Sequence, residues 1–138
     1  METMVESQHI ERIVRLVLPP HDRHVRTARL VAADAATRAG LDCDETDDLR
    51  IAVDEVCHAL LRRGGGRQLS LAFEGDPDDG VRVDAWVDRA PPAGEDDLTA
   101  FTTAVLGWVA DSFDLTDTPE RFGFVVWKRH DQGAGCTR

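Results

Sequence analysis

Residues 47–64 constrain the fold most, because their apolar side chains recur at the spacing of an amphipathic helix. The residues that share one face are Leu49, Ala52, Val53, Val56, Cys57 and Leu60. Acidic residues lie before and within the first turns, and Arg62 and Arg63 precede a run of glycines, so both ends carry helix-end signals. Glu55 borders the apolar face on the same side as Asp48 and Ala59. Its position predicts either a solvated residue beside the core or a functional site.

The hydrophobic pattern switches along the chain between the two-residue repeat of strands and the 3.6-residue repeat of helices. Strands are predicted at 11–18, 68–74, 81–87, 113–117 and 122–130, and helices at 22–39, 47–64 and 98–113. The turn sequence GDPDDG predicts a hairpin between the second and third strands. The order β-α-α-β-β-α-β-β predicts an α+β two-layer sandwich, in which three helices cover one face of a mixed, mostly antiparallel sheet.

The length and composition suit one domain. The chain has 138 residues, of which 42% are hydrophobic and 30% are charged. We therefore expect a single domain over residues 1–130 and a frayed tail over 131–138. Because no apolar run is long enough for a membrane span and the N-terminus lacks the pattern of a secretion signal, we expect a cytoplasmic protein that does not bind membranes.

The net charge and the spacing of the cysteines argue against two further classes of protein, those that bind nucleic acid and those that bind zinc. A formal net charge of −10 argues against direct binding of nucleic acid, which needs a basic face. The same charge fits a basic protein partner or simple solubility. The three cysteines, Cys43, Cys57 and Cys136, have no CxxC spacing. The sequence therefore predicts reduced thiols and no zinc or other metal site.

Several features together resemble the RsbW-type anti-sigma factors. They are the order of elements, the LRIAVDEV run in 49–56, an alternating strand that ends near residue 88, and the later VLGWVADSFDL run. These proteins are small members of the superfamily of Hsp90-like and histidine-kinase-like ATPase domains, and the likeness is greatest for their actinobacterial, UsfX-like branch. The resemblance implies the histidine-kinase-like ATPase fold, a homodimer, and two protein partners, an alternative sigma factor and an anti-anti-sigma factor.

The resemblance also implies a nucleotide site, whose residues are altered in this chain. In the family, a Glu on the second helix is the general base and an Asn four residues later holds magnesium. Glu55 fits the first position, but Ala59 stands at the second, and a methyl group cannot bind a cation. The adjacent His58 points elsewhere around the helix and is predicted to be a surface or packing residue.

The next family motif, DxGxG, corresponds to the stretch DRAPP at 88–92, in which both glycines are replaced. Asp88 also has the strand parity of the outward residues, whereas the family's Asp faces inward. The stretch 96–103 lacks the glycines of a phosphate-binding lid and carries two carboxylates. We therefore interpret Glu55 and Asp88 as positions of a degenerate nucleotide site. No cofactor is expected, and ATP and magnesium would bind only if that site were functional.

Binding to a sigma factor does not require this chemistry. In the family the first helix presents an arginine to the sigma factor, and Ala28-Arg29 occupies that place here. Arg29 and its neighbour Arg26 are therefore predicted to be partner-binding residues. The alternative is a solvated basic helix face.

Two functions follow from the resemblance. The first is an anti-sigma factor that sequesters an alternative sigma factor of the stress or sporulation type and is released by an anti-anti-sigma factor. The second is an ATP-dependent serine protein kinase that phosphorylates the anti-anti-sigma factor, with Glu55 as its catalytic base. The altered nucleotide motifs favour the first. A third interpretation is a domain that has the ATPase fold but serves an unrelated ligand or interaction.

Overall fold

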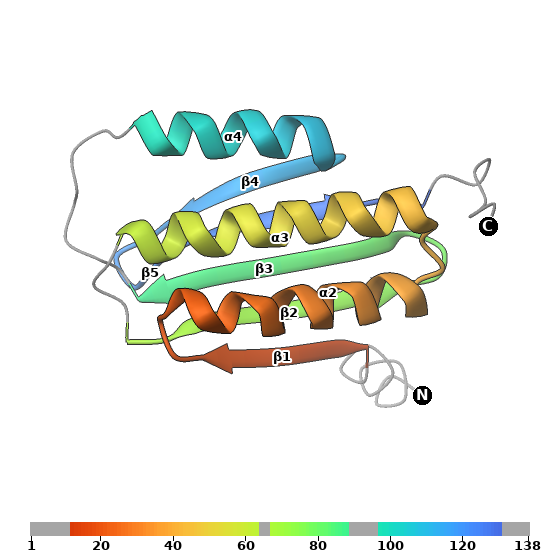
Figure 1. Ribbon diagram of the computed structural model, residues 1–138, viewed down its shortest axis with the longest axis horizontal. Helices are drawn as coiled ribbons and strands as arrows, with labels where there is room; N and C mark the ends of the chain where they lie inside the picture. Colours follow the sequence, from red (N-terminus) through yellow and green to blue (C-terminus); the bar gives the residue numbers. More distant parts are fainter. Residues whose placement is uncertain (1–11, 64–66, 89–96, 131–138) are drawn as a thin grey trace.

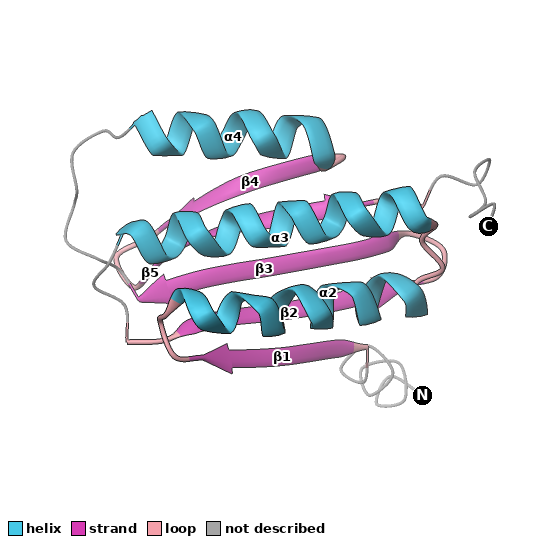
Figure 2. Cartoon of the chain, in the orientation of Figure 1, coloured by secondary structure: helices cyan, strands magenta, loops and turns pink. Residues whose placement is uncertain are grey.

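A computed structural model describes residues 12–63, 67–88 and 97–130 of the chain. The elements are β1 (Ile13–Leu18), the short 3-10 helix η1 (Asp22–His24), α2 (Val25–Arg38), α3 (Cys43–Arg63), β2 (Leu69–Asp76), β3 (Gly80–Asp88), α4 (Asp97–Val109), β4 (Ser112–Asp117) and β5 (Arg121–Lys128). The strands form one sheet in the order β1-β2-β3-β5-β4. The three α-helices lie on one face of this sheet (Figure 1 and Figure 2). The predicted α+β sandwich is confirmed, and every described strand pairing is antiparallel.

The core lies between the helices and the sheet. In β3 the buried residues are Val81, Val83, Ala85 and Val87, and the alternate residues lie on the open face of the sheet. Helix α2 buries a face made mainly of alanine: Val25, Ala28, Ala32, Ala35 and Ala36. Such small side chains let α2 pack closely against α3 and β2. The inward faces predicted for 22–39, 47–64 and 81–87 are therefore confirmed.

Helix α3 begins at Cys43, earlier than the predicted start at residue 47. The reason is a capping box, in which the side chain of Asp42 accepts the Glu45 backbone N–H at 2.7 Å and the Glu45 carboxylate accepts the Asp42 N–H at 2.8 Å. Glu45 is buried, and its carboxylate lies 3.3 Å from Nδ1 of His130. The acidic run therefore forms the first turns of the helix, where negative charge is favourable. Helix α4 ends at Val109, before the predicted end at 113, because Ser112 already begins β4.

The predicted β2–β3 hairpin is confirmed, with Asp76 paired to Gly80 across the turn. Gly80 adopts a φ of 105°, which favours glycine. A Cβ at this position would also overlap the backbone carbonyl of Lys128 in β5. Glycine is therefore required both by the turn and by the close approach of the neighbouring strand.

The cysteines differ from one another. Cys57 is a free thiol on the buried face of α3, whereas Cys43 is disulfide-bonded. The prediction of reduced thiols is therefore wrong for Cys43, and Cys136 and the predicted tail lie outside the described residues. Burial, followed by the negative charge of Asp54, raises the pKa of Cys57 to about 12. Within the described ranges, no helix is both long and apolar enough to cross a membrane.

Candidate functional site

Glu55 lies in the interface between α3 and α4, where its carboxylate is held by two donors. Its side chain is 16% exposed. Oε1 accepts a hydrogen bond from Thr102 Oγ1 at 2.8 Å and a weaker one from Arg62 Nη2 at 3.4 Å. Arg62 Nη2 also lies 3.4 Å from Thr102 Oγ1, so the three side chains form a closed triangle. Glu55 is thus not a fully solvated residue, because its carboxylate is bound by two side chains of the same domain.

Thr102 completes this contact from α4, and the sequence analysis did not identify it. It is fully buried and faces α3 across the packed helix pair. A general base must reach a hydroxyl of the substrate. Here the hydroxyl in hydrogen-bond contact with Oε1 belongs to Thr102 itself. The geometry therefore assigns Glu55 a role in joining α3 to α4.

The position one turn after Glu55 offers no ligand for a cation. Ala59 is partly buried and packs against the core. The side chain of Arg62 extends back along α3, and its guanidinium forms an ion pair with the Glu55 carboxylate. A magnesium ion needs oxygen ligands, and a guanidinium is itself a cation. Among the described residues, no group of three or more His, Cys, Asp and Glu side chains is placed to hold a metal ion.

At the end of β3, the last inward residue that the structure describes is Val87, whose side chain cannot accept a hydrogen bond from an adenine amino group. Val87 faces the helices and is buried, whereas Asp88 is exposed and lies on the other face of the sheet, opposite Arg121 in β5. The register partner of Val87 is Phe122, and the guanidinium of Arg63 lies 3.9 Å from the centre of the Phe122 ring. A guanidinium only donates hydrogen bonds. The inward surface at this end of the sheet is therefore apolar and cationic.

Glu55 and Asp88 are thus not brought together by the fold. One lies between two helices and the other on the open face of the sheet. The remaining positions of the altered DRAPP motif, 89–92, and the first residue of the predicted lid lie outside the described residues. The sequence did not predict a role at the site for Arg62, Arg63 or Thr102. Arginines at the end of a helix also interact favourably with the helix dipole, so their presence there does not by itself indicate a site.

Arg29 lies between α2 and α3 and pairs with Asp54. Its Nη1 donates to Asp54 Oδ1 at 3.0 Å, and its side chain is 41% exposed. His58 joins the same cluster, because its Nδ1 lies 2.9 Å from the Asp54 carbonyl oxygen. The predicted placement of His58 away from Glu55 is therefore confirmed. Arg26 is exposed on the same helix as Arg29.

A groove of about 340 Å³ accompanies Arg29. Its lining residues are Arg29, Asp47, Arg50, Ile51 and Asp54. Ile51 is 48% exposed, and Leu30, next to Arg29 in the chain, is 61% exposed. These two apolar residues lie on the outward faces of their helices, for which the periodicity of the buried stripes gives no signal. Arg29 therefore lies in a groove that combines charged side chains with the exposed apolar side chain of Ile51.

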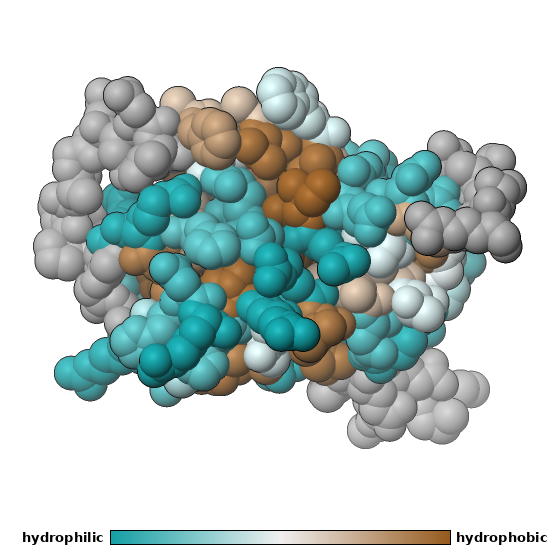
Figure 3. Space-filling model, viewed as in Figure 1, coloured by the Kyte–Doolittle hydropathy of each residue, from teal (hydrophilic) through white to brown (hydrophobic). Residues whose placement is uncertain are grey.

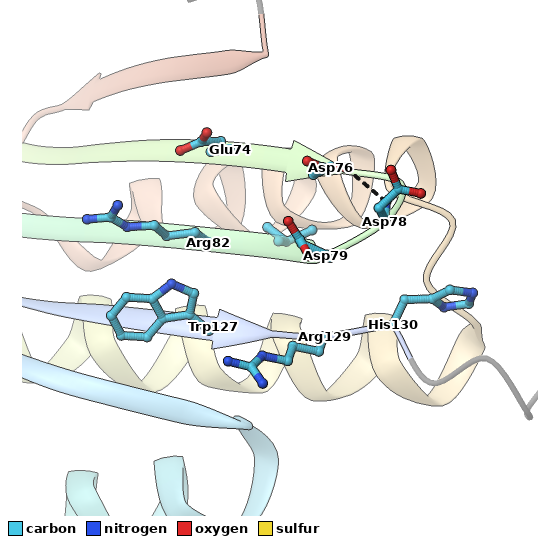
Figure 4. Close-up of a pocket in the computed structure, with 10 residues that line it drawn as sticks. Glu74, Asp76, Asp78, Asp79, Arg82, Trp127, Arg129 and His130 are labelled. Atoms are coloured by element: carbon cyan, nitrogen blue, oxygen red, sulfur yellow. Dashed lines mark hydrogen bonds between the residues drawn. The ribbon is translucent and has the colours of Figure 1, made fainter. Parts of the chain in front are cut away.

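A second cavity, of about 500 Å³, lies at the β2–β3 turn, at the opposite end of β3 from Asp88 (Figure 4). Its charged and aromatic lining residues are Glu74, Asp76, Asp78, Asp79, Arg82, Trp127, Arg129 and His130. Asp76 accepts the backbone N–H of Asp78 at 2.9 Å, and Arg82 lies 5.5 Å from the centre of the Trp127 ring. Several of these charges therefore serve the turn and the open face of the sheet. The cavity contains none of the predicted site residues.

Comparison with known proteins gives one family. The profile of the histidine kinase-like ATPase domain matches residues 18–135. The match covers most of the chain and includes the helices that carry Arg29, Glu55 and Thr102. No curated protein matches the chain.

Proposed function

We propose that this chain, which belongs to the family of histidine kinase-like ATPase domains, is an anti-sigma factor. It sequesters an alternative sigma factor of the stress or sporulation type, and an anti-anti-sigma factor releases it by competition. In this proposal the fold is a scaffold for binding proteins, and the nucleotide site is degenerate. The more specific branch, RsbW-type and UsfX-like, rests on the sequence resemblance alone.

One observation carries the proposal: the carboxylate at the catalytic position is engaged within the domain. Glu55 is bound by Thr102 and Arg62, and Ala59 stands where a magnesium ligand is needed. The residues present do not fit a magnesium nucleotide, because the site offers neither a cation ligand at 59 nor an inward acceptor at 87. We infer that a domain of this family without a nucleotide site acts by binding proteins through its surfaces.

The groove between α2 and α3 supports the location of sigma-factor binding. Arg29 uses one nitrogen for Asp54, and a guanidinium has five N–H donors, so donors remain for a carboxylate of the partner. Asp54 holds the arginine in place before binding, which lowers the entropy cost of association. Ile51, which lines the same groove, adds exposed apolar area beside it.

The experiment that tests the proposal measures sigma-factor affinity by calorimetry. Each alternative sigma factor encoded in the source genome is titrated with the wild-type chain and with Arg29→Ala and Arg38→Ala. Arg38 is the matched control, since it lies on the same helix and pairs at the surface with Asp34. We expect Arg29→Ala to weaken binding by roughly thirtyfold, because a charge-assisted anchor is worth about 2 kcal/mol or more. Arg38→Ala should change it by less than about threefold.

Two outcomes would contradict the proposal. Failure of every sigma factor to bind would exclude the function. Equal affinities of Arg29→Ala and Arg38→Ala would exclude this interface. Asp54→Asn separates a direct from an indirect effect of Arg29, because it removes the negative charge of the internal partner and leaves the arginine in place. The resemblance also implies a homodimer, which light scattering of the eluted protein measures.

The retained Glu55 favours one second candidate, a serine protein kinase acting on the anti-anti-sigma factor. In that case Glu55 would act as the base that receives the proton of the substrate hydroxyl. Glu55→Gln would then abolish phosphate transfer from radiolabelled ATP while leaving sigma-factor binding unchanged. Transfer that disappears in this variant would replace the binding-module proposal by the kinase.

A further inference from the structure

His58 lies close to two acidic side chains beside the groove that contains Arg29, which we call the Arg29 groove. Its ring Nδ1 lies 2.9 Å from the carbonyl oxygen of Asp54, one turn earlier on α3, and 3.5 Å from Oδ2 of the same residue. Its Nε2 lies 4.0 Å from Oδ1 of Asp22 in η1, the turn that leads into α2. Hydrophilic side chains cover much of the surface over α2 and α3 (Figure 3). The His58 side chain is 34% exposed, so it exchanges protons with solvent.

The carboxylate of Asp54 is shared between His58 and Arg29. Its Oδ1 accepts the hydrogen bond from Arg29 Nη1 at 3.0 Å, and its Oδ2 is the oxygen that faces the His58 ring. The two basic side chains therefore use different oxygens of one carboxylate and do not displace each other. Any change in the charge of His58 acts on the group that positions Arg29.

The carbonyl contact fixes where the neutral ring carries its proton. A carbonyl oxygen only accepts hydrogen bonds, so the Nδ1–H of His58 donates to Asp54 and Nε2 is bare. Protonation of the ring then places a proton on Nε2, which faces the Asp22 carboxylate. Histidine side chains change charge between about pH 5 and pH 8. The carboxylates of Asp22 and Asp54 favour the charged ring, and the positive charge of Arg29 opposes it.

The remaining charges near His58 do not replace these contacts. In the part of the chain that the structure describes, no other acidic side chain lies within 4.0 Å of the ring. The basic side chains that follow Asp22 in the chain are Arg23, His24 and Arg26, and within the same residues none of them bonds the ring. The Arg29 groove is lined by two arginines and two aspartates, so its formal charge is zero. A charged His58 therefore makes this region net positive.

We propose that His58 is a positioning residue of the Arg29 groove and that its protonation strengthens the binding of a partner there. The inference rests on the proposed function, in which the spare donors of Arg29 bind a carboxylate of the sigma factor. A charged His58 holds Asp54 through Oδ2 while Oδ1 keeps Arg29 in place. It also offsets the negative charge of Asp54, which otherwise repels the carboxylate of the partner. Both effects act in the same direction, so the partner binds more tightly as the pH falls.

The first measurement needs no partner. The Nε–H signals of the arginine side chains in the full chain are followed by NMR from about pH 8 to about pH 5.5, where histidines titrate and ordinary carboxylates stay ionised. We expect the Arg29 signal to shift with pH in the wild type and to stay constant in His58→Gln. The matched control is His24→Gln, because His24 is the residue at which the helix of Arg29 begins. This control should keep the shift.

The second measurement is the affinity for the sigma factor that binds in the calorimetric test above, at the same two pH values. We expect the affinity of the wild type to rise roughly threefold more than that of His58→Gln between about pH 8 and about pH 5.5, the scale of one exposed ion pair. Comparing the two chains removes the contribution of histidines in the sigma factor, because both chains meet the same partner. Thermal melts at both pH values check that the variants are folded.

Three results would overturn the proposal. An Arg29 signal that does not move with pH, or that moves equally in His58→Gln, would show that His58 does not act on Arg29, whether or not a sigma factor binds. Equal pH dependence of the two affinities would exclude an effect on the partner. Failure of every sigma factor to bind would exclude the proposed function and with it the role in partner binding, while the NMR result would still decide whether His58 positions Arg29.

Discussion

At the scale of single residues, the surroundings of Glu55 decide its role. The same carboxylate can serve as a base or as part of the structure, and the difference lies in what its oxygens contact. Its Oε1 is bound by Thr102 and Arg62 inside a helix interface. A carboxylate in that position is costly to leave with fewer donors, because it has already lost much of its water.

Thr102→Val removes the hydroxyl and keeps the shape of the side chain. We expect the free energy of unfolding to fall by about 1–3 kcal/mol, since Glu55 then loses its shorter hydrogen bond inside the interface. Urea unfolding measures the change. Thr103→Val is the control, because Thr103 bonds only a backbone carbonyl of its own helix. Equal destabilisation by the two substitutions would remove the special role of the Glu55–Thr102 contact.

Cys57 gives a prediction for pH. Its pKa is raised from 9.0 to about 12 by burial and by Asp54. The neutral thiol is therefore retained in the folded state above the pH at which the unfolded chain ionises. The corresponding stability is complete below about pH 9 and is lost as the pH rises towards 12, at about 1.4 kcal/mol per pH unit. Urea unfolding of the wild type and Cys57→Ala should show a steeper alkaline decline in the wild type. Parallel pH profiles would contradict the raised pKa.

At the scale of elements, Lys128 joins three of them. Its Nζ at the end of β5 lies 3.1 Å from Asp48 of α3 and 3.1 Å from the carbonyl oxygen of Val109 at the end of α4. The side chain is 12% exposed. The lysine therefore fixes α4 against the rest of the domain, at the end opposite to its first turn.

Lys128→Met keeps the aliphatic stem and removes the charge. We expect a loss of about 2 kcal/mol in the free energy of unfolding, because Asp48 and a helix carbonyl lose a shared, largely buried donor. Arg38→Met breaks a solvent-exposed pair with Asp34 and should cost less than about 0.5 kcal/mol. Comparable losses for the two variants in urea unfolding would show that Lys128 is only a surface residue.

The elements that repeat a pattern were predictable from the sequence. The buried stripe of α3 and the β2–β3 hairpin follow from periodicity and turn residues, and both are confirmed. The start of α3 was missed, although Asp42 and Glu45 have the spacing of a capping box. Thr102 could not be found in this way, because its partner lies 47 positions away in the chain. Contacts between distant elements depend on packing that no local pattern contains.

At the scale of the whole molecule, the chain has the fold of its family, and the Glu55 carboxylate on α3 is bound by side chains of the same domain. The helices and the antiparallel sheet retain the family arrangement. The Arg29 groove is the outward surface at which we propose that a partner binds.

We propose that nucleotide binding has been lost, and calorimetric titration of the full chain with ATP and magnesium tests this most directly. Loss of the cation ligand and of the adenine acceptor should each cost at least ~1–3 kcal/mol. We therefore predict no binding tighter than roughly millimolar, with no change in the fluorescence of Trp86, Trp108 and Trp127. Binding in the micromolar range would contradict the account and favour the kinase.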